Sequence, residues 1–268
     1  MNSTLEKTFE IFVRRISLSQ QQIDEAVERA EEICQFLSQA TTVQECKMTG
    51  SMARSTAIQK FSDIDVVAVL SPQPPAETTP HSITARLLDT LKLRYREARI
   101  SDNTVRIRFA QGPDVDVIPA IPDVGNPKSG SFKIPSADRG RWNSYDPGER
   151  NQKINRKGAL LGGEFIHLIQ IIKWWSKCNG QPIASYEIEN IASSAFRFRM
   201  PSITRAIVDF FELAESSSEM RSKDHVASLS VARAIANKAL QCEKQGDVRG
   251  ALNHWGSLLG DQFSSVIS

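Results

Sequence analysis

The feature that most restricts the fold of this chain is the apolar run Val66 to Leu70, because two acids stand at its entrance. A short, unbroken, valine-rich run predicts a strand that is buried on both faces of a sheet. Asp63 and Asp65 introduce this run, and residues two apart on a strand project to the same side. Carboxylates held so close repel each other, and without a cation one of them tends to take up a proton. A divalent metal such as Mg²⁺, which prefers oxygen ligands, removes that conflict.

A second pair of acids occurs in the stretch GPDVDVIPA, where Asp114 and Asp116 share one face of another predicted strand. If that strand lies beside the first, at least three carboxylates converge, and three acids can hold two metal ions. One ion would activate an attacking hydroxyl, and the other would neutralise a leaving pyrophosphate. For Asp114, a solvated or salt-bridged position on the same strand is favoured over a direct metal role.

A Gly-Ser pair precedes the first two acids at Gly50 and Ser51. The glycine lets the backbone turn tightly after a strand, and the amide groups and Ser51 hydroxyl would face a triphosphate at the start of a short helix. Neither Gly-Ser nor Asp-x-Asp is specific alone, because both occur by chance in solvated loops. Their spacing, the following strand and the later strand-borne acid together predict a metal and phosphate site. Arg54 and Thr56, in the turn that follows, are candidates to support the phosphate. The alternative for Arg54 is a position on a helix surface.

Apolar periodicity predicts helices at both ends of the chain and short strands between them. A capping box at Ser19 and Gln22 is expected to start the second helix. Residues 121 to 157 are rich in Pro, Gly, Asn and Ser, so we expect loops there, pinned by Trp142 and Tyr145. The predicted strands are Val43–Met48, Ile64–Leu70, Thr104–Phe109 and Val115–Ala120, and the predicted helices outside the first forty residues are Ile83–Tyr95, Gly162–Cys178, Ser185–Phe198, Ile203–Ala214, Val226–Gly246 and Gly250–Leu259. The outline is an α+β fold: a small mixed sheet bracketed by helices, followed by an all-helical half.

The amino-acid composition limits the kinds of partner that this protein is expected to bind. The 268 residues are 40% hydrophobic, which suits the packed core of one large domain or two joined lobes. The 33 basic and 31 acidic residues leave a net charge of only +2, which argues against binding of duplex nucleic acid. The N-terminus lacks the apolar core of a signal peptide, and no run approaches the roughly 18 apolar residues of a membrane span. We therefore expect a cytoplasmic protein without a membrane partner.

The cysteines carry no metal-binding or redox motif, because none stands in a CxxC pair or near a histidine at ligand spacing. We expect free, mostly buried thiols in a reducing compartment. They are Cys34, Cys46, Cys178 and Cys242.

The segment GSMARSTAIQKFSDIDVV, followed by VDVIPA, resembles the nucleotidyltransferase core of the DNA polymerase β superfamily. It is specifically similar to the CD-NTases, the bacterial relatives of cyclic GMP-AMP synthase and oligoadenylate synthase. The segments WNSYDPGERNQKIN, HLIQIIKWWSKCNGQPIASYEIE and ARAIANKALQCEKQGDVRGALNHWGSLLGDQF resemble that family's helical lobe and closing helices. The resemblance implies N-terminal helices spanning both lobes at residues 1–40, the core at 41–125, and a helical lobe with crossover loops at 126–268.

The resemblance also assigns site residues. Asp63, Asp65 and Asp116 would hold two Mg²⁺ ions, with Mn²⁺ as an alternative. Gly50 and Ser51 would hold the donor triphosphate.

Three residues of the helical half complete the implied site. Lys173 lies on a helix that is apolar nearly all round, so its side chain must reach out, and a lysine there requires an anionic partner. By the resemblance, Lys173 contacts the nucleotide phosphates, Ser185 gives a second phosphate contact, and the Tyr186 ring stacks on the donor base. The alternatives are a snorkelling surface lysine for Lys173 and a core aromatic for Tyr186.

The resemblance implies a Mg²⁺-dependent nucleotidyltransferase that makes a cyclic di- or oligonucleotide second messenger from NTPs, ATP or another, and releases pyrophosphate. Its setting would be bacterial anti-phage (CBASS-type) signalling, with a downstream effector that senses the product. An alternative is a transferase that adds a single nucleotide to a protein, RNA or small molecule, or makes linear oligoadenylate. A catalytically inactive binding module is a third hypothesis, but it predicts broken metal ligands, whereas all three acids are present.

Overall fold

The chain forms two compact units in the computed structural model, which describes residues 3–40, 42–71, 78–123, 131–136, 140–217 and 222–267. The helical unit comprises Met1–Leu18, Thr56–Phe61 and Ile154–Ser268, and the sheet unit comprises Ser19–Ser55 and Ser62–Lys153.

The sheet unit is built on β2 (Ile64–Leu70), which pairs with β1 (Val43–Thr49) on one side and β5 (Val115–Pro122) on the other. The strand order is β1-β2-β5-β4-β3, with β4 at Thr104–Ile107 and β3 at Arg99–Ser101. The β2–β5 pair is parallel, whereas β1–β2, β4–β5 and β3–β4 are antiparallel. Two further strands, β6 (Phe132–Pro135) and β7 (Trp142–Tyr145), continue from the end of β5. The predicted small mixed sheet of an α+β fold is confirmed.

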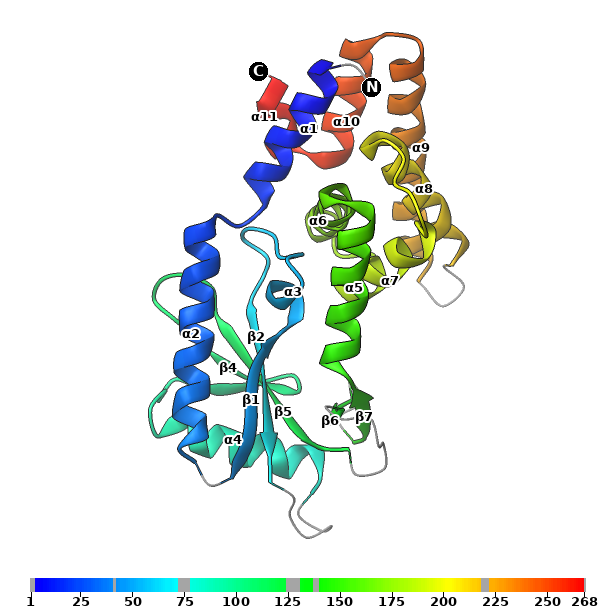
Figure 1. Cartoon of the computed structure of the whole chain (residues 1–268). Coiled ribbons are helices and arrows are strands. Elements are labelled where there is room, and N and C mark those ends of the chain that lie inside the picture. Colours follow the sequence, from blue (N-terminus) through cyan, green and yellow to red (C-terminus); the bar gives the residue numbers. More distant parts are fainter. Residues whose placement is uncertain are drawn as a thin grey trace. The chain divides into compact units, whose positions relative to one another are not determined.

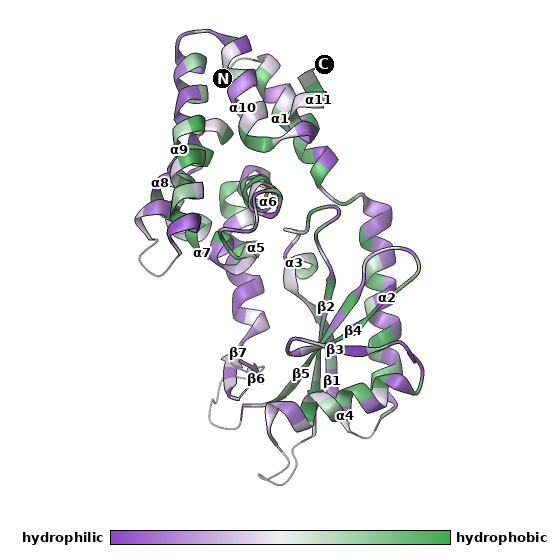
Figure 2. Ribbon diagram, turned by 180° about the vertical axis from the view of Figure 1, so that it is seen from behind, coloured by the Kyte–Doolittle hydropathy of each residue, from purple (hydrophilic) through white to green (hydrophobic). Residues whose placement is uncertain are grey.

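Helices α2 (Gln20–Ser38) and α4 (Pro80–Lys92) cover one face of this sheet. Alternate residues of β2, namely Ile64, Val66, Ala68 and Leu70, pack against them, while Val67 and Val69 face a smaller cluster with Ala120 and Phe132. Every β2 residue except Asp65 is at most 2% exposed, so the predicted burial on both faces is confirmed. Figure 2 shows β2 and β5 as hydrophobic, whereas α2 alternates between hydrophobic and hydrophilic residues.

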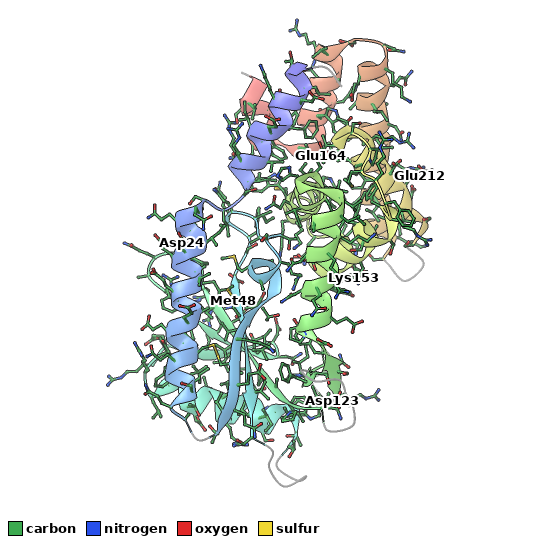
Figure 3. The ribbon with its side chains drawn as sticks, in the orientation of Figure 1. Asp24, Met48, Asp123, Lys153, Glu164 and Glu212 are labelled. Atoms are coloured by element: carbon green, nitrogen blue, oxygen red, sulfur yellow. A yellow bond between two sulfur atoms is a disulfide. The ribbon has the colours of Figure 1, made fainter. Side chains whose placement is uncertain are left out.

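Helix α2 runs alongside β1 (Figure 1). Its start carries the predicted capping box: Gln22 N donates to Ser19 Oγ, and Ser19 N donates to the Gln22 side chain. Asp24, labelled on α2 in Figure 3, is exposed, whereas Met48 on β1 packs against the core between helix and sheet. The polar side of α2 therefore faces water and its apolar stripe faces the sheet.

The helical unit packs around α6 (Gly163–Cys178), whose residues from Leu168 to Ser176 are all buried. Helix α6 contacts α1 (Ser3–Ile16), α7 (Ser185–Ala195), α8 (Ile203–Ser216) and α10 (Val248–Leu259). Edge-to-face aromatic contacts join Phe9 and Phe12 of α1 to Phe263 of α11 (Asp261–Ile267), and Phe9 to Trp255 of α10. The long α9 (Lys223–Lys244) packs on α8 and α10. None of the helices in the described ranges combines the length and apolar character needed to cross a membrane.

The expectation of loops between residues 121 and 157 is partly wrong. This region contains β6, β7 and α5 (Pro147–Leu161), in addition to short connections. Helix α5 lacks a broad apolar stripe, and only Ile154 in it belongs to the core, so periodicity gave no signal for it. The two aromatic residues do pin the region: Trp142 Nε1 donates to Thr78 O at 2.9 Å, and the Tyr145 hydroxyl lies 2.9 Å from Thr49 Oγ1.

The expectation of four free thiols is wrong. Cys34 of α2 and Cys46 of β1 form a disulfide that ties the helix to the edge of the sheet, while Cys178 and Cys242 are free. Spacing alone did not reveal the pair, because no motif joins the two cysteines; packing of α2 against β1 brings them together.

We predict that unfolding the unreduced protein exposes two reactive thiols, from Cys178 and Cys242, and that prior reduction raises the count to four. Replacing Cys34 and Cys46 together by serine should lower the free energy of unfolding by about 2–3 kcal/mol, because the cross-link restricts the unfolded chain. Thiol titration and urea unfolding measure the two effects. Cys178→Ser is the control and should change stability little; four reactive thiols in the unreduced, unfolded protein would contradict the disulfide.

Candidate active site

A row of polar side chains crosses the sheet on the face opposite α2 and α4. Thr49 of β1 is paired in register with Asp65 of β2, Asp65 with Asp116 of β5, and Asp116 with Arg106 of β4. Residues paired in register project to the same face, so the row places two of the predicted metal ligands on neighbouring parallel strands. Asp63 lies two positions before Asp65, on the approach to the same strand. Asp65 is in register with Asp116, and Asp63 and Asp116 both contact Arg106, but among the described residues the three carboxylates do not form one group that could hold an ion. The predicted convergence of three carboxylates therefore stays a prediction.

Arg106 joins two of these acids. Its Nε donates to Asp116 Oδ1 at 2.8 Å, and its Nη2 donates to Asp116 Oδ2 at 2.6 Å and to Asp63 Oδ2 at 3.1 Å. The hydrogen bond with Asp116 raises the pKa of the Arg106 guanidinium above its ordinary value, and the charges of Asp116, Asp63 and Asp114 add to it, although partial burial acts in the opposite direction. The arginine is a permanent cation within the acidic face. None of the sequence motifs includes this arginine.

Gly50 directly follows β1 and lies against the Asp65 side chain. Its φ is +71°, and a Cβ at this position would lie 1.8 Å from Asp65 Oδ2. The glycine is thus required twice, for its backbone conformation and for the close approach of a carboxylate. Ser51 follows in the one-turn helix α3 (Gly50–Ala53) and is partly buried. Thr49, fully buried, holds the end of β1 through its hydrogen bond with Tyr145.

The donor set of this face fits a divalent metal. Asp63, Asp65 and Asp116 offer carboxylate oxygens, the ligands that Mg²⁺ prefers, and the glycine leaves room for Asp65. Throughout the described ranges, no three His, Cys, Asp or Glu side chains already stand as a group that could hold an ion. In this structure, Arg106 supplies the positive charge between Asp63 and Asp116.

Two other residues of the sheet unit, Asp114 and Arg54, have hydrogen-bond or ion-pair partners of their own. Asp114 accepts a hydrogen bond from Phe109 N at 3.3 Å and lies 3.9 Å from Arg108 Nε, which confirms the salt-bridged interpretation. Arg54 is not on a helix surface, because it is 5% exposed and its Nη1 donates to Asn151 Oδ1 at 3.3 Å.

The remaining predicted residues belong to the helical unit. Lys173 does not reach out of α6: it is 3% exposed, and its Nζ donates to Glu189 Oε1 at 2.8 Å and to Thr56 Oγ1 at 2.8 Å. Glu189, on α7, is 1% exposed and also accepts a hydrogen bond from Thr56 Oγ1 at 3.0 Å. The anionic partner that the sequence required for Lys173 is therefore Glu189, which no local pattern identified.

Ser185 and Tyr186 form the first turn of α7. Tyr186 is 54% exposed, so the alternative interpretation as a core aromatic is wrong. Ser185 is partly buried. The structure thus places Gly50, Ser51 and the three acids in the sheet unit, and Lys173, Ser185 and Tyr186 in the helical unit.

We predict that Gly50→Ala lowers the free energy of unfolding by at least about 2 kcal/mol, because the new methyl group displaces Asp65 in addition to straining the backbone. Gly180→Ala is the matched control: its φ is +76°, but nothing lies within 4 Å of the added Cβ, so it should cost only about 1 kcal/mol. Urea unfolding measures both. Equal losses for the two variants would show that Asp65 does not restrict position 50.

Removing the buried carboxylate should also be costly. Glu189→Gln leaves the buried ammonium of Lys173 without its counter-charge, and we expect a loss of about 3–5 kcal/mol in the free energy of unfolding. The joint variant Lys173→Met, Glu189→Leu should lose less than Glu189→Gln alone. Asp209→Asn, which breaks the partly exposed pair between Asp209 and Arg205 of α8, is the control and should cost below about 1 kcal/mol. A Glu189→Gln loss no larger than that of the control would contradict a buried ion pair.

The chain is similar to a known protein family and to a curated protein. A family model described as the Second Messenger Oligonucleotide or Dinucleotide Synthetase domain (SMODS) matches residues 3–157. A curated protein from Bacillus cereus, named as a probable cyclic nucleotide synthase, is 24% identical over 170 residues, which are 56% of this chain and 51% of that protein. The chain therefore spans about half the length of the curated relative that it matches.

Solved structures match almost the whole chain. CdnC of Escherichia coli MS115-1, solved with ATP, has a TM-score of 0.80 at 16% identity and covers 96% of this chain and 98% of its own. The same protein has also been solved in complex with a HORMA protein, with a TM-score of 0.81 at 16% identity over 96% of this chain and 97% of its own. The CD-NTase CdnG of Bradyrhizobium diazoefficiens, solved with GTP, has a TM-score of 0.76 at 13% identity over 98% of both chains. At these identities the matches show the fold, and they confirm the expected polymerase β-like core with a helical lobe.

Proposed function

This chain belongs to the second messenger oligonucleotide or dinucleotide synthetase family, and on that basis we propose that it joins NTPs into a cyclic di- or oligonucleotide and releases pyrophosphate. The observation that carries this proposal is the register of β2 and β5, which sets Asp65 beside Asp116 on the face that also receives Asp63. The resemblance to CD-NTases seen in the sequence is in keeping with the family match. All three acids are present, which argues against an inactive binding module.

In this proposal, Asp63, Asp65 and Asp116 hold two Mg²⁺ ions, and Mn²⁺ can replace them. Bound divalent cations would polarise the reacting phosphoryl group and neutralise charge on the leaving pyrophosphate. Asp116 accepts the proton of the acceptor hydroxyl, since a carboxylate held within the site can act as a general base. Gly50 and Ser51 bind the donor triphosphate through their amide groups and the Ser51 hydroxyl, which follow the turn that the positive φ of Gly50 permits.

Ser185 and Tyr186 would add a phosphate contact and a stacked ring, for which the exposure of Tyr186 is favourable. Lys173 differs from the other proposed phosphate contacts because its ammonium group is already paired within the helical unit. Its ammonium must first leave Glu189 and Thr56, with which it forms hydrogen bonds at 2.8 Å. We retain it as a contact only for a state in which this ion pair opens.

The setting of this reaction is also a proposal. We place it in the cytoplasm, with the core at residues 41–125, the helical lobe at 126–268 and the helices of 1–40 along both. ATP, alone or with another NTP, would be the substrate, and a downstream effector would sense the product in bacterial anti-phage (CBASS-type) signalling. The runner-up activity is transfer of a single nucleotide to a protein, RNA or small molecule, or synthesis of linear oligoadenylate.

The test is to incubate the purified protein with Mg²⁺ and the four ribonucleoside triphosphates, treat the mixture with phosphatase, and identify what survives by mass spectrometry. A cyclic product resists phosphatase because it has no terminal phosphate. We expect such a product from the wild type, and a more than hundredfold lower rate from Asp63→Asn, Asp65→Asn or after metal removal, since metal binding supplies several kcal/mol of transition-state stabilisation.

Asp114→Asn is the matched control. It removes a carboxylate two residues from Asp116, but this carboxylate is engaged by Arg108 and Phe109, so the rate should be retained. Surviving oligonucleotides whose mass shows free hydroxyl groups at both ends would indicate linear synthesis, and nucleosides alone would indicate that no nucleotides were joined. Label found only on protein or RNA would indicate the single-nucleotide transferase.

A further inference from the structure

The acidic face already contains a cation of its own, the guanidinium of Arg106. Its fork engages both oxygens of Asp116, at 2.8 and 2.6 Å, and Nη2 also lies 3.1 Å from Asp63 Oδ2. Paired, planar contacts of this kind are stronger and more directional than single ones. Arg106 therefore links two of the three carboxylates assigned to the metals.

This arrangement follows from the sheet. Arg106 and Asp116 are register partners on antiparallel β4 and β5, so their side chains leave the same face side by side. Asp63 belongs to the approach to β2, on the far side of β5 from β4. Arg106 Nη2 thus lies within hydrogen-bond distance of one carboxylate on β5 and of another on the approach to β2, and both belong to residues that would hold the metal.

Not all of these hydrogen bonds must break for a metal to bind. A carboxylate oxygen has two lone pairs, so Asp116 can keep its hydrogen bonds to Arg106 and still offer an oxygen to a metal. The contact to Asp63 is the longest of the three and crosses the space between the two carboxylates. It is the contact that Asp63 would give up in order to bind a metal ion.

We propose that Arg106 is a built-in counter-ion of the acidic face: it fixes Asp116 through its paired hydrogen bonds and competes with a divalent cation for Asp63. This inference rests on the proposed function, because it takes the three acids as metal ligands. It makes Arg106 a positioning residue that keeps the site assembled without metal and lowers the affinity for free metal. A triphosphate that brings its own Mg²⁺ adds phosphate ligands and overcomes this competition, so metal and nucleotide load together.

The test is the binding of Mn²⁺ without nucleotide, measured by calorimetry or by the electron paramagnetic resonance signal of free Mn²⁺. Arg106→Gln removes the charge and the fork, and we expect its Kd for Mn²⁺ to fall about tenfold, as loss of one hydrogen bond to a charged group predicts. In EDTA the same variant should melt at a lower temperature than the wild type, because its carboxylates repel each other. Saturating Mn²⁺ should raise its melting temperature more than that of the wild type.

Arg108→Gln is the matched control. It removes the same charge two residues away on the chain, from a side chain that is 60% exposed and lies 3.9 Å from Asp114. It should leave both the Kd and the melting shift unchanged. Arg106→Lys keeps the charge but loses the paired contacts, so its Kd should lie between those of the wild type and Arg106→Gln; it also serves if the glutamine variant does not fold.

The outcomes separate this inference from the proposed function. If the wild type binds Mn²⁺ and Asp116→Asn does not, the metal site stands, and an unchanged or higher Kd for Arg106→Gln overturns the role of Arg106. The same holds if Arg108→Gln lowers the Kd as much as Arg106→Gln, since net charge alone then explains the effect. If neither the wild type nor Arg106→Gln binds Mn²⁺, with or without a non-hydrolysable triphosphate, the metal site itself is wrong.

Discussion

The parallel pairing of β2 with β5 is the constraint on which the rest of the sheet unit depends. It sets Asp65 opposite Asp116 and, through the neighbouring antiparallel pairs, sets Thr49 and Arg106 in the same row. A slip of one residue would turn the carboxylates into the core beneath α2 and α4 and bring apolar residues to the polar face. The alternation in β2, with Ile64, Val66, Ala68 and Leu70 against the helices, makes such a slip costly because it would expose a buried apolar set.

Several contacts outside the acidic row hold this register. Arg29 of α2 donates to Pro113 O at 2.7 Å and to Gln111 O at 3.1 Å, and its guanidinium lies 4.2 Å from the Phe109 ring centroid. It thereby fixes the turn that leads from β4 into β5. The disulfide between Cys34 and Cys46 fixes the same helix to β1. Helix α2 is thus attached both to β1 and to the turn between β4 and β5, so its role extends beyond covering the sheet.

The two units differ in how their charged side chains are paired and how deeply these pairs are buried. In the sheet unit, Arg106 meets two acids on a partly exposed face, where a soluble cation can compete for the same oxygens. In the helical unit, Lys173, Glu189 and Thr56 satisfy one another within the core, and both charged side chains are at most 3% exposed. The cost of separating buried charges gives the second group a structural role in the state described here. The exposed acids can exchange partners more easily, because water offsets part of that cost.

The amino-acid sequence by itself determined the strand Ile64–Leu70, the helices α1 and α2, the second with its cap, and which acids within each predicted strand share a face, because periodicity and residue type act locally. It also required glycine at position 50 and an anion near Lys173, although not which one. The sequence did not predict helix α5, because its apolar periodicity is weak. Only the tertiary structure decided that Arg106 lies between Asp63 and Asp116, that Glu189 meets Lys173, and that Cys34 meets Cys46. These pairs join residues from different strands and helices, and only the packing of those elements brings them into contact.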